Sequence, residues 1–111
     1  MGKTANHLTR DIEKYIQFVS TQIPIEKIIL FGSVAKGTAT KDSDIDLAII
    51  SSEFGKAPLK EKMQLYEWRY DADIQDDLQP FPFGTVEFRN SDDFFIKEIK
   101  NTGIDITEDV L

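Results

Sequence analysis

Residues 28–50 read IILFGSVAKGTATKDSDIDLAII, and this stretch decides the fold of the chain. It begins inside a mostly apolar, β-rich run from Ile25 to Phe31, bounded by Pro24 and Gly32, which predicts a buried strand. A glycine-containing turn follows, and residues 44–50 then alternate in the way a second strand does. The segment therefore predicts two strands joined through a tight turn.

The second strand carries two carboxylates on one face. Asp44 and Asp46 are two residues apart, so both side chains leave the same side of the strand, opposite the face of Ile45, Leu47 and Ile49. Adjacent carboxylates with no basic residue between them repel each other, and such a pair either shares a proton or surrounds a cation. Oxygen ligands of this kind suit Mg²⁺ or Mn²⁺. The alternative is a pair of solvated charges, although Asp is a poor strand residue.

The turn between the strands reads Gly32-Ser33-Val34-Ala35-Lys36-Gly37. Gly32 would let backbone N–H groups approach a phosphate closely, Ser33 adds a hydroxyl donor, and Lys36 is long enough to reach a triphosphate. In the structural alternative Gly32 only ends the strand and Ser33 only caps a short helix. The turn is not a Walker A loop, because no Gly-Lys-Ser/Thr follows at the required spacing.

The rest of the chain predicts three helices and one further strand. Apolar side chains spaced by three and four predict a helix between about Thr4 and Ile23. A second amphipathic helix begins near Pro58, and its apolar positions are Leu59, Met63, Tyr66 and Tyr70. Two prolines confine the strand predicted at residues 78–83 to an edge of the sheet. A last helix follows Asn90 or Ser91 as N-cap and ends at Gly103, and residues 104–111 leave room for a short strand.

This order of elements predicts one domain over residues 1–111. Its class is α/β (α+β), with a small mixed sheet of three or four strands and helices packed on one face.

Composition excludes several classes of function. The chain has 111 residues, a net charge of −7 and no cysteine, so disulfides, thiolate metal sites and cysteine nucleophiles are absent. The single histidine, His7, cannot build a zinc site by itself. The acidic charge disfavours nucleic acid as a partner. No apolar run reaches the roughly 18 residues of a membrane helix, and the N-terminus lacks a signal-peptide core, so we expect a cytoplasmic protein.

Together the motifs resemble a known signature. Gly32-Ser33-x-Ala35-x-Gly37, followed after five residues by Ser43-Asp44-x-Asp46-Leu47, is similar to that of the minimal nucleotidyltransferases, in the DNA polymerase β-like nucleotidyltransferase superfamily. The resemblance implies that Asp44 and Asp46 are catalytic and hold two Mg²⁺ ions, with Mn²⁺ as an alternative. It also implies an NTP-binding set, which comprises Gly32, Ser33, Lys36, Gly37 and Ser43.

The family also uses a third carboxylate on the neighbouring strand, which binds metal and can accept a proton. Asp71, Asp73, Asp76 and Asp77 lie in the right region. Residues 77–83, DLQPFPF, resemble a family variant that reads Asp-Ile-Glu-Pro-x-Pro-Phe, which favours Asp77 as the catalytic and metal-binding residue and leaves Asp73 as the next choice. Gln79 stands where that variant has Glu, so the sequence leaves open whether the site is fully equipped.

Two functions follow from the resemblance. The first is an enzyme that transfers a nucleoside monophosphate, AMP from ATP, to an acceptor hydroxyl, as the antitoxin of a two-protein toxin–antitoxin pair with a small helical partner protein. The second is a module of the same fold that binds a partner without catalysis. A homodimer or a docked subunit is a further expectation, because Phe81, Phe83, Phe88, Phe94 and Phe95 are difficult to hide in so small a core. Tyr66, Trp68 and Tyr70 are expected in the core or in a docking surface.

Overall fold

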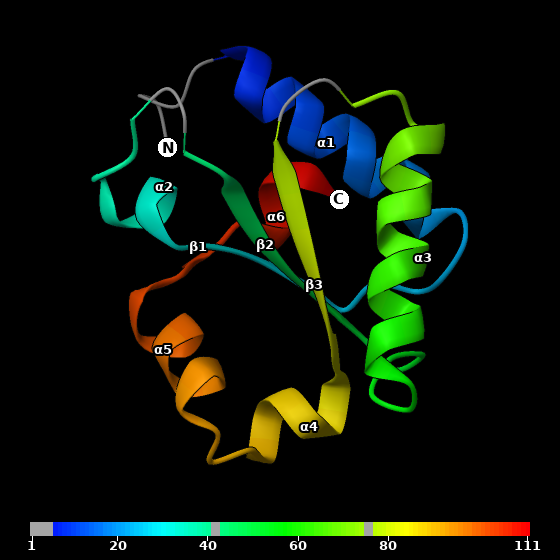
Figure 1. The fold of residues 1–111 in the computed structure, drawn as a ribbon, viewed down its shortest axis with the longest axis vertical. Helices are drawn as coiled ribbons and strands as arrows, with labels where there is room; N and C mark the ends of the chain where they lie inside the picture. Colours follow the sequence, from blue (N-terminus) through cyan, green and yellow to red (C-terminus); the bar gives the residue numbers. More distant parts are fainter. Residues whose placement is uncertain (1–5, 41–42, 75–76) are drawn as a thin grey trace.

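The computed structural model describes residues 6–40, 43–74 and 77–111. Its elements are α1 (Asn6–Ser20), β1 (Lys27–Phe31), α2 (Ser33–Lys36), β2 (Ile45–Ser51), α3 (Pro58–Asp71), β3 (Leu78–Gly84), α4 (Thr85–Asn90), α5 (Phe94–Thr102), β4 (Ile104–Asp105) and α6 (Thr107–Val110). Figure 1 shows the strands crossing the middle of the molecule, with α3 along one side and α4 and α5 at the opposite end from α1. No helix among the described residues is long and apolar enough to cross a membrane.

The four strands form one mixed sheet in the order β3-β2-β1-β4. β1 pairs antiparallel with β2 and with β4, whereas β2 pairs parallel with β3. A parallel pair needs a crossover connection, and α3 supplies it between β2 and β3. The predicted mixed sheet of three or four strands is confirmed, with four strands. The predicted edge position of β3, the strand that contains Pro80 and Pro82, is also confirmed.

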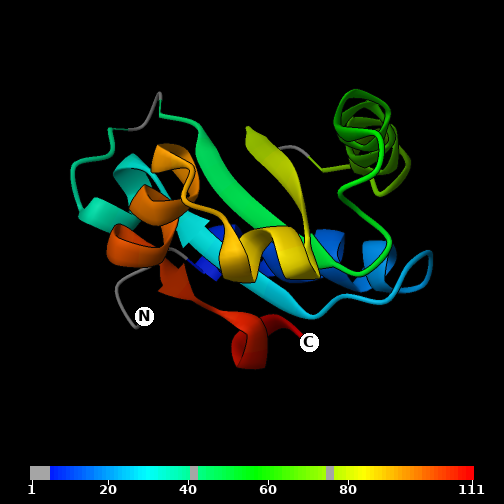
Figure 2. The ribbon, with the colours of Figure 1, turned by 90° about the horizontal axis from the view of Figure 1, so that it is seen from below.

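Helices cover both faces of the sheet (Figure 2). On one face α1 packs Ile12, Tyr15, Ile16 and Val19 against the inner side chains of β1 and β2. On the other face Phe88 of α4 and Ile96 and Ile99 of α5 cover a second, smaller core. The predicted fold class is confirmed, but the expectation that helices pack on one face alone is wrong. After Asp46, the side chains on both faces of β2 are buried, so helices must pack on each face of the sheet.

Several boundaries differ from the sequence prediction. α4 and α6 were not predicted, because with six and four residues they are too short to show an apolar stripe. Asn90 ends α4, and the N-cap of α5 is Asp93, which accepts a hydrogen bond from Ile96 N at 3.4 Å. Gly103 follows the last residue of α5 and β4 is the short strand after it, both as predicted.

The apolar stripe of α3 faces the solvent rather than the core. Leu59, Met63 and Tyr70 are 74%, 64% and 84% exposed. The inner side of the helix is formed instead by buried Leu65 and partly buried Trp68, and the Tyr15 hydroxyl donates to Leu65 O at 2.7 Å. The helix lies where the sequence predicts it. Its apolar stripe, however, faces the solvent, although such a stripe usually packs on the core.

Candidate active site

Gly32 lies directly against the carboxylate of Asp46. The turn leaves β1 with Gly32 at φ 78° and ψ −156°, a conformation that essentially only glycine adopts. A Cβ atom at this position would collide with Oδ2 of Asp46. The glycine therefore brings the Gly-Ser turn and the second strand into contact, as the predicted phosphate and metal site requires.

Asp46 occupies the middle of a three-strand row at this end of the sheet. It pairs in register with Phe31 of β1 on one side and with Gln79 of β3 on the other. Asp44 precedes β2, and its Oδ2 accepts a hydrogen bond of 2.8 Å from Nε2 of Gln79. Since residues 44, 46 and 79 share a face, the structure brings two carboxylates and one amide together.

The two carboxylates disturb each other electrostatically. Partial burial raises the pKa of Asp46 above its ordinary value, the negative charge of Asp44 raises that pKa further, and Lys62 opposes the shift. A divalent cation would relieve both the repulsion and the desolvation, so the donor set fits Mg²⁺. Asp44 and Asp46 are the residues that would hold it.

The remaining members of the predicted nucleotide-binding set lie close in the chain to this site. Lys36 ends α2, and its Nζ forms an exposed ion pair with Glu98 of α5 at 3.3 Å. Gly37 follows in the left-handed conformation at φ 78°, with open space around it. Ser43 precedes Asp44, and its Oγ accepts a hydrogen bond from Thr40 N at 2.9 Å. The binding roles of Ser33, Lys36, Gly37 and Ser43 stay predictions.

The third carboxylate is not brought to the pair in this structure. The Asp77 side chain is 72% exposed, and its Oδ1 lies 3.9 Å from a guanidinium nitrogen of Arg69. Asp71 and Asp73 are exposed at the end of α3 and just beyond it, and Asp76 lies outside the described residues. Within the part of the chain that the structure describes, no three His, Cys, Asp or Glu side chains gather closely enough to hold a metal ion. Asp77 as the third ligand stays a prediction, and Gln79 occupies the adjacent position.

Sequence reasoning missed two side chains of α3 that lie beside the carboxylate pair, Lys62 and Tyr66, and a third, Arg69, that lies beside Asp77. Lys62 reaches over the edge strand, with Nζ 3.3 Å from Pro80 O and 3.5 Å from the centre of the Phe81 ring. Burial lowers the pKa of Lys62, and the charge of Asp46 opposes that shift. The pKa of Tyr66 is raised, mainly by burial, with Arg69 opposing and Asp44 and Asp46 contributing. The detectable signal is the helical spacing of residues 62, 66 and 69, which puts their side chains on one flank of α3.

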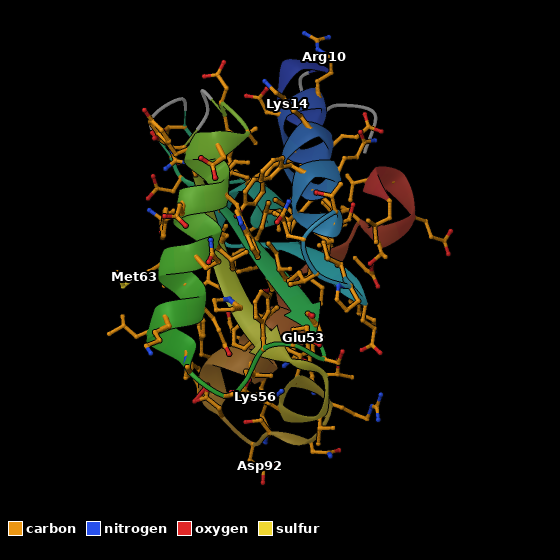
Figure 3. All side chains as sticks on the ribbon, turned by 90° about the vertical axis from the view of Figure 1, so that its right-hand side faces the viewer. Arg10, Lys14, Glu53, Lys56, Met63 and Asp92 are labelled. Carbon is orange, nitrogen blue, oxygen red and sulfur yellow. The ribbon has the colours of Figure 1, made fainter. Side chains whose placement is uncertain are left out.

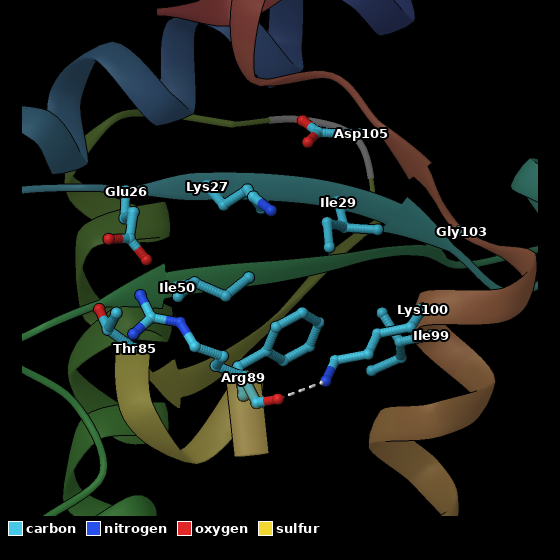
Figure 4. A pocket seen from close by; sticks show the side chains of 11 residues that line it. Glu26, Lys27, Ile29, Ile50, Thr85, Arg89, Ile99, Lys100, Gly103 and Asp105 are labelled. Carbon is cyan, nitrogen blue, oxygen red and sulfur yellow. Dashed lines mark hydrogen bonds between the residues drawn. The ribbon is translucent and has the colours of Figure 1, made fainter. Parts of the chain in front are cut away.

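A hollow of about 480 Å³ lies at the other end of the sheet, where β1 begins and β2 ends (Figure 4). Ile29, Ile50 and Ile99 form apolar parts of its lining, and Lys27 and Arg89 stand at its rim. Neither Asp44 nor Asp46 lines it. The hollow is thus separate from the carboxylate site.

The mixed sheet, the Gly-Ser turn and the paired aspartates define a nucleotidyltransferase. The family "Polymerase beta, Nucleotidyltransferase" matches residues 13–109, and the chain belongs to this family. The predicted superfamily and the assignment as a transferase are therefore confirmed.

Two proteins of Methanocaldococcus jannaschii are similar in sequence. "Putative protein adenylyltransferase MJ0141" is 27% identical over 97 residues, which cover 86% of this chain and 94% of that protein. "Putative protein adenylyltransferase MJ1379" is 29% identical over 66 residues, covering 60% of this chain and 66% of that protein.

Two solved structures share the fold. The structure of "a putative nucleotidyltransferase from Sulfolobus solfataricus" superposes with a TM-score of 0.64 at 16% identity, over 96% of this chain and 90% of that one. The structure described as "the toxin-antitoxin with AMP-PNP" superposes with a TM-score of 0.63 at 20% identity, over 92% of this chain and 73% of that one. At these identities the likeness concerns the fold.

Proposed function

We propose that this chain transfers AMP from ATP to a hydroxyl of a protein, using Mg²⁺ held by Asp44 and Asp46. The observation that carries the proposal is the contact of Gly32 with the Asp46 carboxylate, beside Asp44. This contact puts a phosphate-binding type of turn and a metal-binding type of carboxylate pair within one site. The names of both M. jannaschii relatives support a protein as the acceptor.

The reaction breaks the bond between the α-phosphorus of ATP and its bridging oxygen to the β-phosphorus, and forms a bond from the α-phosphorus to the acceptor oxygen. Pyrophosphate leaves, and the acceptor proton passes to solvent. Bound Mg²⁺ would neutralise the triphosphate and stabilise charge on the attacking and leaving oxygens. The chain itself supplies the positioning: Gly32 and Ser33 hold phosphate oxygens, Ser43 fixes the approach to Asp44, and Lys36 is released from its exposed pair with Glu98 to meet the triphosphate.

The acceptor in this proposal is a small helical protein, with the chain acting as the antitoxin of the pair. The neighbour described as a toxin–antitoxin with AMP-PNP supports this reading through its fold.

The test is transfer of label from α-³²P-ATP, with Mg²⁺, to the protein encoded beside this one in its genome. Label on that protein is expected, and Asp44→Asn or Asp46→Asn should reduce the rate by about 10²–10³-fold, since metal–phosphate stabilisation contributes several kcal/mol. Glu53→Gln is the matched control, because it neutralises an exposed carboxylate on a distant loop (Figure 3). Removal of Mg²⁺ by chelation should also stop the transfer. Equal labelling by all three variants would contradict the proposal.

A binding module without catalysis is the second candidate, and Gln79 favours it. The amide occupies the position beside Asp46, and Asp77 is turned to Arg69. If the chain is an enzyme that relies on Asp77, Asp77→Asn abolishes label transfer and leaves folding unchanged. If it is a binding module, the partner co-purifies tightly, no label moves, and Asp77→Asn changes nothing. Gln79→Glu should raise transfer if a missing carboxylate limits the rate.

A further inference from the structure

The outward face of α3 carries an apolar stripe that nothing in the described chain covers. Leu59, Met63 and Tyr70 are 74%, 64% and 84% exposed, and Tyr66 lies partly buried between them. Figure 3 shows the Met63 side chain pointing away from the molecule. The opposite side of the helix packs on α1 and β3 through Leu65. A stripe of this kind on a well-packed helix marks an interaction surface.

The spacing of the stripe is symmetric about its middle. The steps from 59 to 63, from 63 to 66 and from 66 to 70 are four, three and four residues. A two-fold axis between residues 64 and 65 that reverses the helix direction therefore sets Leu59 opposite Tyr70 of a second copy. The same axis sets Met63 opposite Tyr66 of the second copy. An isologous interface requires this self-complementarity, and alternating steps of three and four residues are those of packed helix pairs.

The charged residues beside the stripe are also self-complementary when two copies of α3 pack antiparallel. At 100° per residue, Lys60, Glu67 and Asp71 lie on one flank of the stripe, the basic residue toward the start of α3 and the acidic ones toward its end. All three side chains are exposed, and none of them forms an ion pair with the described residues. In the antiparallel arrangement Lys60 meets Glu67 and Asp71 of the second copy.

We infer that this chain forms a two-fold homodimer through antiparallel packing of α3 against α3 of a second copy. The 14-residue helix is about 21 Å long, so the pair buries less than a standard interface of ~1,600 Å². The dimer is therefore weak, with a dissociation constant in the micromolar range or above. The inference is independent of the proposed function, because it does not use the carboxylates, and Tyr66 is the one residue of the stripe that also lies beside them.

Paired cysteines test the geometry, and the absence of native cysteine makes the test clean. In Leu59→Cys/Tyr70→Cys the two thiols of one chain are about 16 Å apart along the helix, too far for a disulfide within the chain. In the antiparallel dimer each thiol meets the other kind on the second copy. Oxidation should give a covalent dimer of twice 12.7 kDa. Leu59→Cys and Tyr70→Cys alone are the controls and should remain monomeric, because like positions lie about 16 Å apart in the dimer as well. Single variants that crosslink as readily as the pair would overturn the inference.

A charge exchange tests the register in solution without oxidation. Sedimentation equilibrium of the unmodified chain should show a mass that rises above 12.7 kDa with concentration. Lys60→Glu and Glu67→Lys should each weaken association several-fold, because each places like charges opposite one another. The double variant Lys60→Glu/Glu67→Lys should recover much of the loss. A mass that stays at 12.7 kDa up to about 1 mM overturns the dimer and leaves the stripe to a different protein partner. Additive losses in the double variant overturn the antiparallel register.

Discussion

At the residue scale, the site depends on how closely Gly32 approaches Asp46. The glycine has no side chain, so the backbone of the turn can lie against the carboxylate that would hold the metal. The unusual dihedral angles of Gly32 and the partial burial of Asp46 are parts of the same arrangement. A backbone conformation open only to glycine and an unfavourable charge pair at one place are typical of a functional site.

Gly32→Ala should disable the enzyme more than it destabilises it. The backbone conformation costs about 1–3 kcal/mol for any other residue, and the new methyl group must push the Asp46 carboxylate aside. A displacement near 1 Å lowers transfer by about 10²-fold. Gly37→Ala is the comparison variant, because Gly37 also has a positive φ of 78° but open space surrounds it. Label transfer and urea denaturation are measured for both variants. If the collision of the new methyl group with Asp46 matters, Gly32→Ala loses more activity than Gly37→Ala, and equal activity of the two variants would rule it out.

Asp46→Asn should stabilise the metal-free protein at neutral pH. The folded-state pKa of Asp46 is raised, mainly by burial and next by Asp44, so ionisation costs the folded state free energy above that pKa. The gain is at most about 1 kcal/mol, because water screens the partly exposed pair. It should fade as the pH falls toward about 4, where the unfolded chain also protonates this group. Urea denaturation from pH 8 to pH 4 measures it, and a gain that grows on acidification would contradict this origin.

At the element scale, the short C-terminal elements are tied to the sheet by one side-chain network. Thr107 donates its backbone N–H to Oδ1 of Asp105 at 2.9 Å, and its hydroxyl contacts the same carboxylate. The same hydroxyl accepts a hydrogen bond from Ile28 N of β1 at 2.9 Å. β4 and α6 are thus attached to the central strand by Thr107 as well as by the burial of Ile106 and Val110. The network explains how a two-residue strand persists at the edge of the sheet.

Asp105→Asn should lower stability by up to about 1 kcal/mol at neutral pH, the typical contribution of an exposed charge-assisted hydrogen bond. The pKa of Asp105 is lowered, chiefly by the hydrogen bond from the Thr107 hydroxyl, so its ionised form favours folding. This contribution is complete above the unfolded pKa of about 3.9 and is lost as the pH falls through the folded pKa. The difference in urea midpoint between the two proteins should therefore be constant from pH 8 to about 5 and close toward pH 3. Asp109→Asn, at an exposed position of α6, is the comparison variant.

At the scale of the whole molecule, the sheet joins three distant segments at one end. The turn after β1, the start of β2 and the start of β3 meet there because β1 and β2 are antiparallel and β2 and β3 are parallel. α3 then places Lys62, Tyr66 and Arg69 along the same edge. A ligand that bridges these segments should stabilise the whole fold, because it binds only when all of them are assembled.

AMP-PNP with Mg²⁺ should raise the thermal midpoint of the wild-type chain. At tenfold excess over the dissociation constant the stabilisation is about 1.4 kcal/mol, roughly 5 °C or more for a domain of this size. Asp44→Asn should lose the shift, and so should the wild-type chain with AMP-PNP and a chelator. Differential scanning fluorimetry measures all three, and a shift that survives in Asp44→Asn would place nucleotide binding elsewhere.

The sequence by itself determined the two central strands, the turn between them and the family. These depend on local rules: apolar alternation fixes a strand and its faces, and spacing fixes that Asp44 and Asp46 point the same way. The edge position of β3 followed from its prolines for the same reason.

Only the tertiary structure decided what lies opposite these elements. It placed Gln79 on Asp44, turned Asp77 toward Arg69 and brought Lys62 over Phe81, because each contact joins segments whose separation is set by the sheet order. It also covered the second face of the sheet with α4 and α5 and turned the apolar stripe of α3 to solvent. The apolar spacing of a helix shows that one of its faces is apolar. Whether that face packs on the core or is exposed depends on how the whole chain folds.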